Sequence, residues 1–227
     1  AGTKVAVADG HVADGFIVTA SIMGQNGSPV SGLFFVEART AGLSVTPQRL
    51  IDGRLVSTVV FDAAPVPAAY CLASGAAATH VIQHMLRAGY TGLAARQCGL
   101  AEEALRRTLD YMRQRRQFGQ PIGTFQALQH RAALLHCEIE NAWSATLAAA
   151  QALDAGAADA ALRASVAKAK SAETSCMVAA ECLQFHGGIG MTDEHEIGFF
   201  LKQARVEAEL LGGYSFHADA VATALGY

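Results

Sequence analysis

Two short segments carry residue types that hold anionic or amide-rich ligands. Residues 115–119 combine an arginine, a glutamine, an aromatic residue and a glycine. A guanidinium presents a planar fork of donors that suits a diphosphate, and a glycine lets a ligand approach the backbone. Residues 184–191 place three glycines beside a histidine. We therefore expect each segment to contribute to a binding site.

Each segment also has a plainer interpretation. Arg113, Arg115 and Arg116 lie where a long helical pattern ends, and cations at that position stabilise a helix C-terminus. Gly187 and Gly188 also follow a helical pattern, and paired glycines favour the left-handed geometry of a helix end. The second segment is not a Rossmann turn, because no strand leads into it. On the residues alone these alternatives stay open.

The elements that must position these segments fall into two parts. Residues 1–71 read as short strands between turn formers, with 16–22 and 33–38 on either side of a turn cluster at 24–29. This pattern predicts a hairpin and part of a β-barrel or sandwich. Beyond it the apolar spacing is helical, with breaks at Pro121–Gly123 and at 154–156. The sequence therefore predicts an α+β protein in which the β-rich segment precedes an all-α bundle of four or more helices, 72–227.

Composition excludes several classes of protein. The 227-residue chain is 52% apolar and 16% charged with a net charge of −3, which is typical of a well-packed soluble protein. This slight acidity gives no support for nucleic-acid binding. No apolar run approaches the roughly 20 residues that a membrane span needs. Residues 1–7 read as the middle of a strand and not as a secretory signal, so we expect a piece of a longer, cytoplasmic protein.

Cysteine and histidine spacing favours neither disulfides nor a metal. The cysteines are odd in number and have no CxxC spacing, so we expect free, buried thiols in a reducing compartment. They are Cys71, Cys98, Cys137, Cys176 and Cys182. His80 and His84 stand one helical turn apart, but no Glu lies between them and no third ligand is evident. We therefore expect a histidine pair on a helix surface or interface and no metal site.

Together the two segments resemble those of the acyl-CoA dehydrogenase family. The run 115–126 (RRQFGQPIGTFQ) resembles the family's cofactor loop and the helix start that follows it. The run 184–191 (QFHGGIGM) resembles its second glycine-bearing turn, and residues 2–4 and 13–18 are similar to its middle β-domain. The resemblance covers nearly the whole chain, but only the C-terminal half to two-thirds of a typical member.

The resemblance implies a flavoprotein that oxidises an acyl-CoA thioester to the trans-2-enoyl-CoA. It implies FAD as cofactor, an electron-transfer flavoprotein or similar acceptor as partner, and a homo- or hetero-oligomer built as a dimer of dimers. In the family these segments bind the FAD of the neighbouring subunit. The cofactor-binding residues implied here are Arg115, Gln117, Phe118, Phe125, Gln126, Gln184, Phe185, His186, Gly187 and Gly188.

The chain departs from the family at the reaction centre. A carboxylate base removes the α-proton of the substrate while the β-hydrogen leaves as hydride to the flavin. The usual position of that base corresponds to Leu211 and an alternative one to Gly89, and neither residue accepts a proton. The aromatic residue and the threonine that hold the flavin ring would follow Lys4, where residues 5–8 are Val-Ala-Val-Ala. We therefore identify no catalytic residue.

Such a one-sided loss is typical of a base-less subunit that completes the FAD site of its partner. Residues 187–202 also resemble the small-subunit type of heteromeric bacterial acyl-CoA dehydrogenases, which act on bulky or dicarboxylic acyl-CoA substrates. Two alternatives stay open: a homomeric enzyme with an unusual base, Glu209 or His186, and a flavin-free assembly scaffold. Glu209 lies two residues, about 200° around a helix, from position 211.

Overall fold

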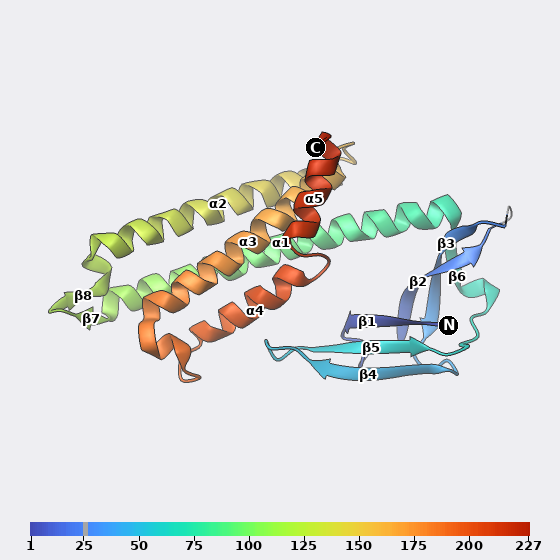
Figure 1. Cartoon of the computed structure of the whole chain (residues 1–227), viewed down its shortest axis with the longest axis horizontal. Helices are drawn as coiled ribbons and strands as arrows, with labels where there is room; N and C mark the ends of the chain where they lie inside the picture. The colour runs from blue at the N-terminus through green and yellow to red at the C-terminus, as the bar shows by residue number, and fades with distance from the viewer. Residues whose placement is uncertain (25–26) are drawn as a thin grey trace. The chain divides into compact units, whose positions relative to one another are not determined.

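The computed structural model describes residues 1–24 and 27–227, which divide into two compact units, Ala1–Met85 and Leu86–Tyr227. The strands of the first unit and the helices of the second can be followed in Figure 1. Helix α1, Gly75–Gln114, runs through the boundary between the units. The predicted division at residue 71 stays a prediction.

The first unit contains two antiparallel sheets of three strands each, ordered β1-β5-β4 and β2-β3-β6. Strands β2 and β3 form the predicted hairpin, with pairing from Gly15 opposite Glu37 to Met23 opposite Pro29. Positions 25 and 26 of the predicted turn lie outside the described residues. Closure of the two sheets into a barrel or sandwich stays a prediction. The strands are β1 Gly2–Ala8, β2 Gly15–Met23, β3 Pro29–Glu37, β4 Leu43–Arg49, β5 Leu55–Phe61 and β6 Cys71–Ser74.

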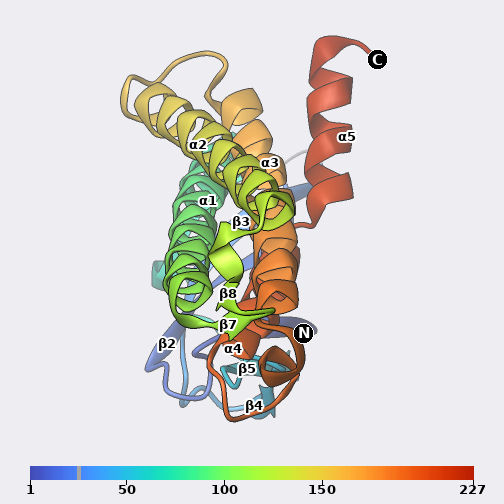
Figure 2. The same cartoon turned by 90° about the vertical axis from the view of Figure 1, so that its left-hand side faces the viewer.

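The second unit is a helical bundle, as predicted. The helices α1, α2 and α3 run lengthwise in Figure 1, and the view along them in Figure 2 shows them side by side. Helices α4 and α5 both pack on α3. None of the described helices is long and apolar enough to cross a lipid bilayer. Besides α1, the helices are α2 Gln126–Asp154, α3 Ala160–His186, α4 Ile197–Glu209 and α5 Tyr214–Leu225.

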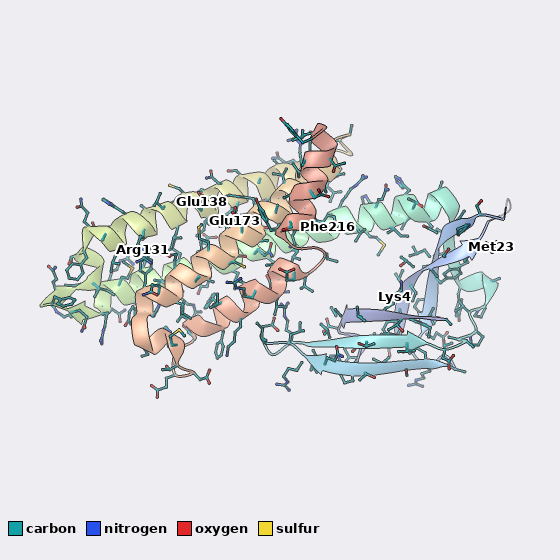
Figure 3. The ribbon with its side chains drawn as sticks, in the orientation of Figure 1. Lys4, Met23, Arg131, Glu138, Glu173 and Phe216 are labelled. Atoms are coloured by element: carbon teal, nitrogen blue, oxygen red, sulfur yellow. The ribbon has the colours of Figure 1, made fainter. Side chains whose placement is uncertain are left out.

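Ion pairs join α2 to α3 along the bundle. Arg131 and Glu138 project from α2 in Figure 3. The Arg131 guanidinium lies 2.5 Å from the carboxylate of Glu181, and Glu138 pairs with the Lys170 ammonium. Partly exposed pairs of this kind stabilise a fold only slightly. Their contribution is therefore mainly to the register of the two helices.

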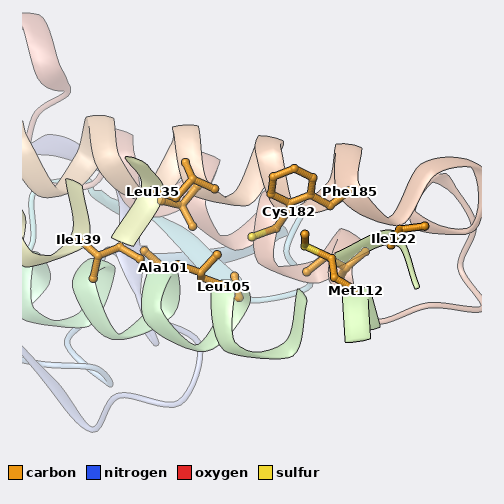
Figure 4. Packing of buried hydrophobic residues seen from close by; sticks show 11 residues of the cluster. Ala101, Leu105, Met112, Ile122, Leu135, Ile139, Cys182 and Phe185 are labelled. Carbon is orange, nitrogen blue, oxygen red and sulfur yellow. The ribbon is translucent and has the colours of Figure 1, made fainter. Parts of the chain in front are cut away.

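The larger of two core clusters in the bundle is drawn mainly from α1, α2 and α3, with Ile122 and Ile197 added. Figure 4 shows Leu105 of α1 beside Leu135 of α2, and Met112 of α1 beside Cys182 and Phe185 of α3. Alanines buried at the helix contacts permit a close approach of the backbones. These are Ala94, Ala149 and Ala167. This core accounts for the helical apolar spacing of the sequence.

The cysteines are all free thiols, but burial differs among them. Cys98 and Cys182 are buried, and burial raises the pKa of Cys182 to about 11. Cys137 is exposed on α2, so the expectation of buried thiols is wrong for that residue. It falls on the outer face of the helix because buried Leu135 and Ile139 define the inner one.

One predicted helix end is misplaced. Helix α1 ends at Gln114, before Pro121, because a two-stranded hairpin of β7, Arg116–Gln117, and β8, Gln120–Pro121, intervenes. Its two turn residues, Phe118 and Gly119, both have positive φ, at 53° and 83°. Turns with two such residues match the twist of paired strands. The predicted end of α3 is confirmed, because Gly187 has a φ of 64°.

The core cluster generates a stability prediction. Ile139 is 2% exposed, and Ile139→Ala removes buried methyl groups and leaves a cavity. We expect the free energy of unfolding to fall by about 2–5 kcal/mol, measured by urea denaturation followed by circular dichroism. Leu134→Ala on the same helix is the control, because Leu134 is 66% exposed, and we expect a change within about 0.5 kcal/mol. Equal losses in both variants would contradict the assigned core.

Candidate functional site

The first predicted segment is the hairpin and short turn between α1 and α2. The backbone amide of Arg115 donates to the carbonyl of Tyr111, and the carbonyl of Arg115 accepts from the amide of Ile122 at 2.8 Å. The side chain of Arg115 is exposed and makes no hydrogen bond to the residues that the structure describes. Phe118 at the hairpin tip is 92% exposed, and its ring lies 6.1 Å from that of Phe125. This segment therefore presents a cation and the Phe118 ring outward, while Phe125 is partly buried against the core.

Helix α2 begins directly after this segment with open amides. Phe125 is its N-cap, and no side chain caps the helix. The first amides of a helix have no partner within it and carry the positive end of the helix dipole. Gln126 and Gln117 are both exposed, and the Gln117 side-chain amide donates to the carbonyl of Arg116 at 2.7 Å. The segment is polar, positively charged and accessible.

The second predicted segment is the end of α3 and the turn η3, Gly187–Met191, that follows. Gln184, Gly187 and Gly188 are exposed. Space is open where a Cβ of Gly187 or Gly188 would stand, since no described atom lies within 4 Å. Phe185 is buried in the core instead, and the Arg131 guanidinium lies over its ring at 4.7 Å. Phe185 thus anchors the turn and does not face outward.

His186 is likewise held inside the turn. Its Nδ1 donates to the carbonyl of Cys182 at 2.7 Å, which leaves Nε2 unprotonated in the neutral ring. Nε2 is buried and has no hydrogen-bond partner among the described residues. Burial lowers the pKa of His186, because the charged imidazolium is poorly solvated there. The ring is therefore neutral near pH 7.

Tyr111 brings the two segments together. Its ring stacks on that of His186 with centroids 4.3 Å apart, and its hydroxyl donates to the His186 carbonyl at 3.3 Å. Tyr111 lies one helical turn before Arg115. His195 packs on the other members of this group and accepts the Ile197 amide at the start of α4. The last turns of α1 and α3 therefore lie at the same end of the bundle.

The two positions without a base also meet in space. A Cβ built on Gly89 would stand 2.9 Å from Cδ1 of Leu211. Leu211 follows α4 and has a φ of 59°, which is rare for a bulky residue. Positions 89 and 211, the two places where the family resemblance puts a catalytic base, thus lie side by side. In this chain an isopropyl group and a hydrogen atom occupy them.

Two buried polar side chains lie beneath the turn that carries Leu211. The Lys168 ammonium donates to the carbonyls of Ala208 and Gly212 at 2.9 and 3.1 Å. His217 Nε2 donates to the carbonyl of Leu211 at 3.1 Å, and its ring meets that of Tyr90 edge to face. Burial lowers the pKa of Lys168 to about 8 and also lowers that of His217.

Neither alternative base lies beside Gly89. The Glu209 carboxylate is turned toward the start of α5, where a Cβ on Gly213 would stand 2.8 Å from its Oε2. His186 belongs to the opposite end of α3, near Tyr111. His80 and His84 are exposed on α1, and no group of three metal-ligating side chains occurs in the part of the chain that the structure describes.

Comparison with known proteins gives this arrangement its family. A family model described as "Acyl-CoA dehydrogenase, C-terminal domain" matches residues 79–226. The chain belongs to the acyl-CoA dehydrogenase family. Acyl-CoA dehydrogenases are flavoprotein oxidoreductases, and their C-terminal domain is helical, as it is here.

Three relatives place the chain more closely. Acyl-CoA dehydrogenase IpdE2 of Mycobacterium tuberculosis is 43% identical over 121 residues, which cover 52% of this chain and 36% of the relative. The solved Tcur3481–Tcur3483 steroid ACAD is 32% identical with a TM-score of 0.86, over 99% of this chain and 58% of that one. The ChsE4–ChsE5 complex of M. tuberculosis is 27% identical with a TM-score of 0.87, over 99% and 58%. The chain thus spans less than two-thirds of each relative.

Sequence reasoning missed the side chains that support both ends of the bundle. Tyr111 shares a helix face with Arg115, but helical spacing alone does not name its partner on α3. Lys168 did carry a signal, because it is a charged residue within a run of alanines on a buried face. His217 gave none, since it lies on a short helix whose neighbours are exposed.

The contact between positions 89 and 211 generates a prediction about stability. Gly89→Ala places a methyl group 2.9 Å from Cδ1 of Leu211. We expect this contact to cost about 1 kcal/mol, which offsets the gain in helix propensity that alanine would bring at an open site of α1. Adding Leu211→Ala should restore most of that loss, since it vacates the shared space. Urea denaturation of the two single variants and the double variant measures the coupling. Additive losses would show that the two side chains do not compete.

The buried ammonium generates a prediction about pH. The pKa of Lys168 is lowered from 10.5 to about 8, so between these values the unfolded chain binds more protons than the folded chain. The free energy of unfolding of wild type, relative to Lys168→Met, should therefore rise by up to about 3 kcal/mol from pH 7.5 to 10.5. Paired urea denaturation curves across this range measure the difference. A difference that stays constant with pH would mean that Lys168 titrates normally.

Proposed function

We propose that this chain is the base-less subunit of a heteromeric, FAD-dependent acyl-CoA dehydrogenase and completes the cofactor site of its partner. The assembled enzyme would oxidise an acyl-CoA thioester to the trans-2-enoyl-CoA and pass electrons to an electron-transfer flavoprotein or a similar acceptor. One observation carries the proposal. The groups suited to a dinucleotide gather at one end of the bundle, while the two places for a base hold Leu211 and Gly89.

The residues present fit the diphosphate and adenosine end of FAD. The exposed Arg115 guanidinium would bind the diphosphate, and Gln117, Gln126 and Gln184 would supply amide groups around it. The open space beside Gly187 and Gly188 allows a ligand to approach the backbone closely. Phe118 and Phe125 offer ring faces near the same loop. Phe185 and His186 would act from inside, by holding the turn.

The residues do not fit the flavin-ring end. Strand β1 has no aromatic residue and no hydroxyl after Lys4, and its pairing with β5 is irregular between Lys4 and Val7. Val5 is 72% exposed and Ala6 has a φ of 54°. A stacking surface for an isoalloxazine is therefore absent from this strand. This supports a chain that contributes to its partner's cofactor and holds no complete site of its own.

The chemical roles divide accordingly. FAD, when bound, supplies the acceptor for the hydride that leaves the β-carbon of the substrate. Arg115 would neutralise the diphosphate, and the hairpin and the Gly187–Gly188 backbone would orient the cofactor. The α-proton must go to a base of the partner, because neither Leu211 nor Gly89 can accept it. We infer a bulky acyl group as substrate, since one relative is described as a steroid ACAD.

Flavin stoichiometry tests the proposal directly. Visible absorption of the chain purified alone, and then of the chain co-purified with its partner subunit, measures FAD per polypeptide. We expect none in the chain alone and one FAD per two polypeptides in the complex. One FAD per chain in the isolated protein would favour the homomeric enzyme, and a colourless complex would favour the scaffold.

Arg115→Ala tests the residue that matters most in this proposal. We expect the Kd of the complex for FAD to rise roughly ten- to a hundredfold, because a charge-assisted contact to phosphate is lost. Flavin titration of the deflavinated complex, followed by fluorescence, measures this Kd. Arg113→Ala is the matched control, because the Arg113 guanidinium is paired with Asp110 at 2.8 Å. Equal affinity in wild type and Arg115→Ala would remove Arg115 from the site.

A further inference from the structure

Three carbonyl groups of one short turn are bound from below by two buried side chains. The turn is 208–213, which includes the last two residues of α4 and ends directly before α5. Lys168 of α3 donates to the carbonyls of Ala208 and Gly212, and His217 of α5 donates to the carbonyl of Leu211. Donors from two different helices therefore converge on the turn. We call Lys168 and His217 the carbonyl clamp.

The clamp is costly for the fold. Lys168 and His217 are both 0% exposed, although an ammonium loses strong hydration on burial. Glu207 and Glu209 favour the charged form of Lys168, but burial outweighs them and lowers its pKa. For stability alone, apolar residues of similar volume would serve as well or better at such a position. The polar donors therefore act on the geometry of the turn.

That geometry is strained. Leu211 and Gly212 both have positive φ, at 59° and 103°. A leucine in this region persists only where the surroundings over-determine it. Gly212 leaves no room for a side chain, since its Cβ would stand 2.6 Å from the Phe216 ring and 3.1 Å from His217 Nε2. Leucine does not favour a positive φ by itself, so we infer that the three hydrogen bonds to the carbonyls hold the turn in this conformation.

Packing does not hold the Leu211 side chain by itself. The residue is 46% exposed, so its isopropyl group gains only part of the free energy of burial. It nevertheless lies against the open side of Gly89. The position of the side chain must therefore come from the backbone beneath it, and that backbone is held by the clamp.

We propose that Lys168 and His217 are positioning residues that fix Leu211 over Gly89, so that this subunit presents a closed apolar wall where a proton acceptor would stand. This inference rests on the proposed function, because only there does the apolar wall stand in the place of a catalytic base. The side chain at 211 acts in this scheme as a filler of space and not as an acid or base. Lys168 and His217 touch no reacting group and act only through the turn.

Amide hydrogen exchange of the complex tests the clamp without any catalytic assay. Lys168→Met and His217→Phe keep the shape of the side chains but remove the donors. In each variant we expect the Gly212 amide, which donates to the Glu209 carbonyl, to exchange roughly ten- to a hundredfold faster. Peptides from the middle of α3 should keep their protection. Lys170→Met is the matched control, since Lys170 lies on the same helix and pairs with Glu138.

A second readout isolates positioning from general stability. In the wild-type background the methyl group of Gly89→Ala meets Leu211, and we expect this contact to lower the unfolding midpoint by roughly 2–4 °C relative to Gly89→Ala in a Leu211→Ala background. In the Lys168→Met or His217→Phe background the turn can move away from residue 89. The contact should then lower the unfolding midpoint by less than half as much. If one clamp variant does not fold, the other gives the same comparison.

The outcomes separate this inference from the proposed function. Unchanged exchange at Gly212, or an equal Gly89→Ala penalty in all backgrounds, would overturn the clamp. Flavin content measured on the same samples reports on the opposite end of the bundle. A wild-type complex that holds no flavin would count against the proposed cofactor site, while faster exchange of the Gly212 amide in the clamp variants of that complex would still support the clamp.

Discussion

The end of the bundle that carries the proposed cofactor site depends on the contact between Tyr111 and His186. The stacked rings and the hydroxyl-to-carbonyl hydrogen bond join the last turn of α1 to the last turn of α3. Without this contact the hairpin after α1 and the glycine turn after α3 would be separate loops. Because His186 is neutral and its Nδ1 proton is committed to Cys182, the stack carries no net charge at neutral pH. A ligand that carries phosphates thus meets cations only at the surface, where water can also solvate them.

At the opposite end of α3 the polar side chains are buried and the exposed residue is apolar. There a buried ammonium and a buried imidazole bind backbone carbonyls, and the exposed residue above them is apolar. At the end that carries the proposed cofactor site, Arg115 and Phe118 face outward, while Phe185 and His186 are buried. One helix, α3, contributes to both ends through Lys168 and His186. The proposed cofactor site and the proposed apolar wall at Leu211 therefore lie near opposite ends of the same helix, α3.

Much of this arrangement could be predicted from the sequence. Alternating strands, helical apolar spacing and the glycine at the end of α3 all identified elements that the structure contains. The absence of a carboxylate at positions 89 and 211 was also readable, because it depends only on residue type. The contact between those two positions was not, since no local pattern relates a residue of α1 to a turn after α4. Phe185 was expected at the cofactor, yet its place in the core follows from the phase of α3.

The hairpin after α1 was missed for a physical reason. Proline normally marks a helix end, but here a strand pair of two residues a side forms first, because Phe118 accepts a positive φ beside Gly119. The clamp was missed because its partners are backbone carbonyls, which every residue carries. Side-chain type therefore says little about which lysine will bind them. The alanine-rich surroundings of Lys168 indicated burial, but its carbonyl partners become visible only when α4 and α5 are packed on α3.

The tight hairpin at 116–121 has a consequence for the thermodynamics of association. Its tip is already ordered by strand pairing and by the edge-to-face contact between Phe118 and Phe125. Ordering a free loop costs about 1–2 kcal/mol per residue in backbone entropy. Here the loop is already ordered when the chain folds, so this cost does not reduce the affinity for a partner. An incoming surface therefore meets a pre-organised aromatic tip, and the affinity gained from covering it is not spent on freezing the loop.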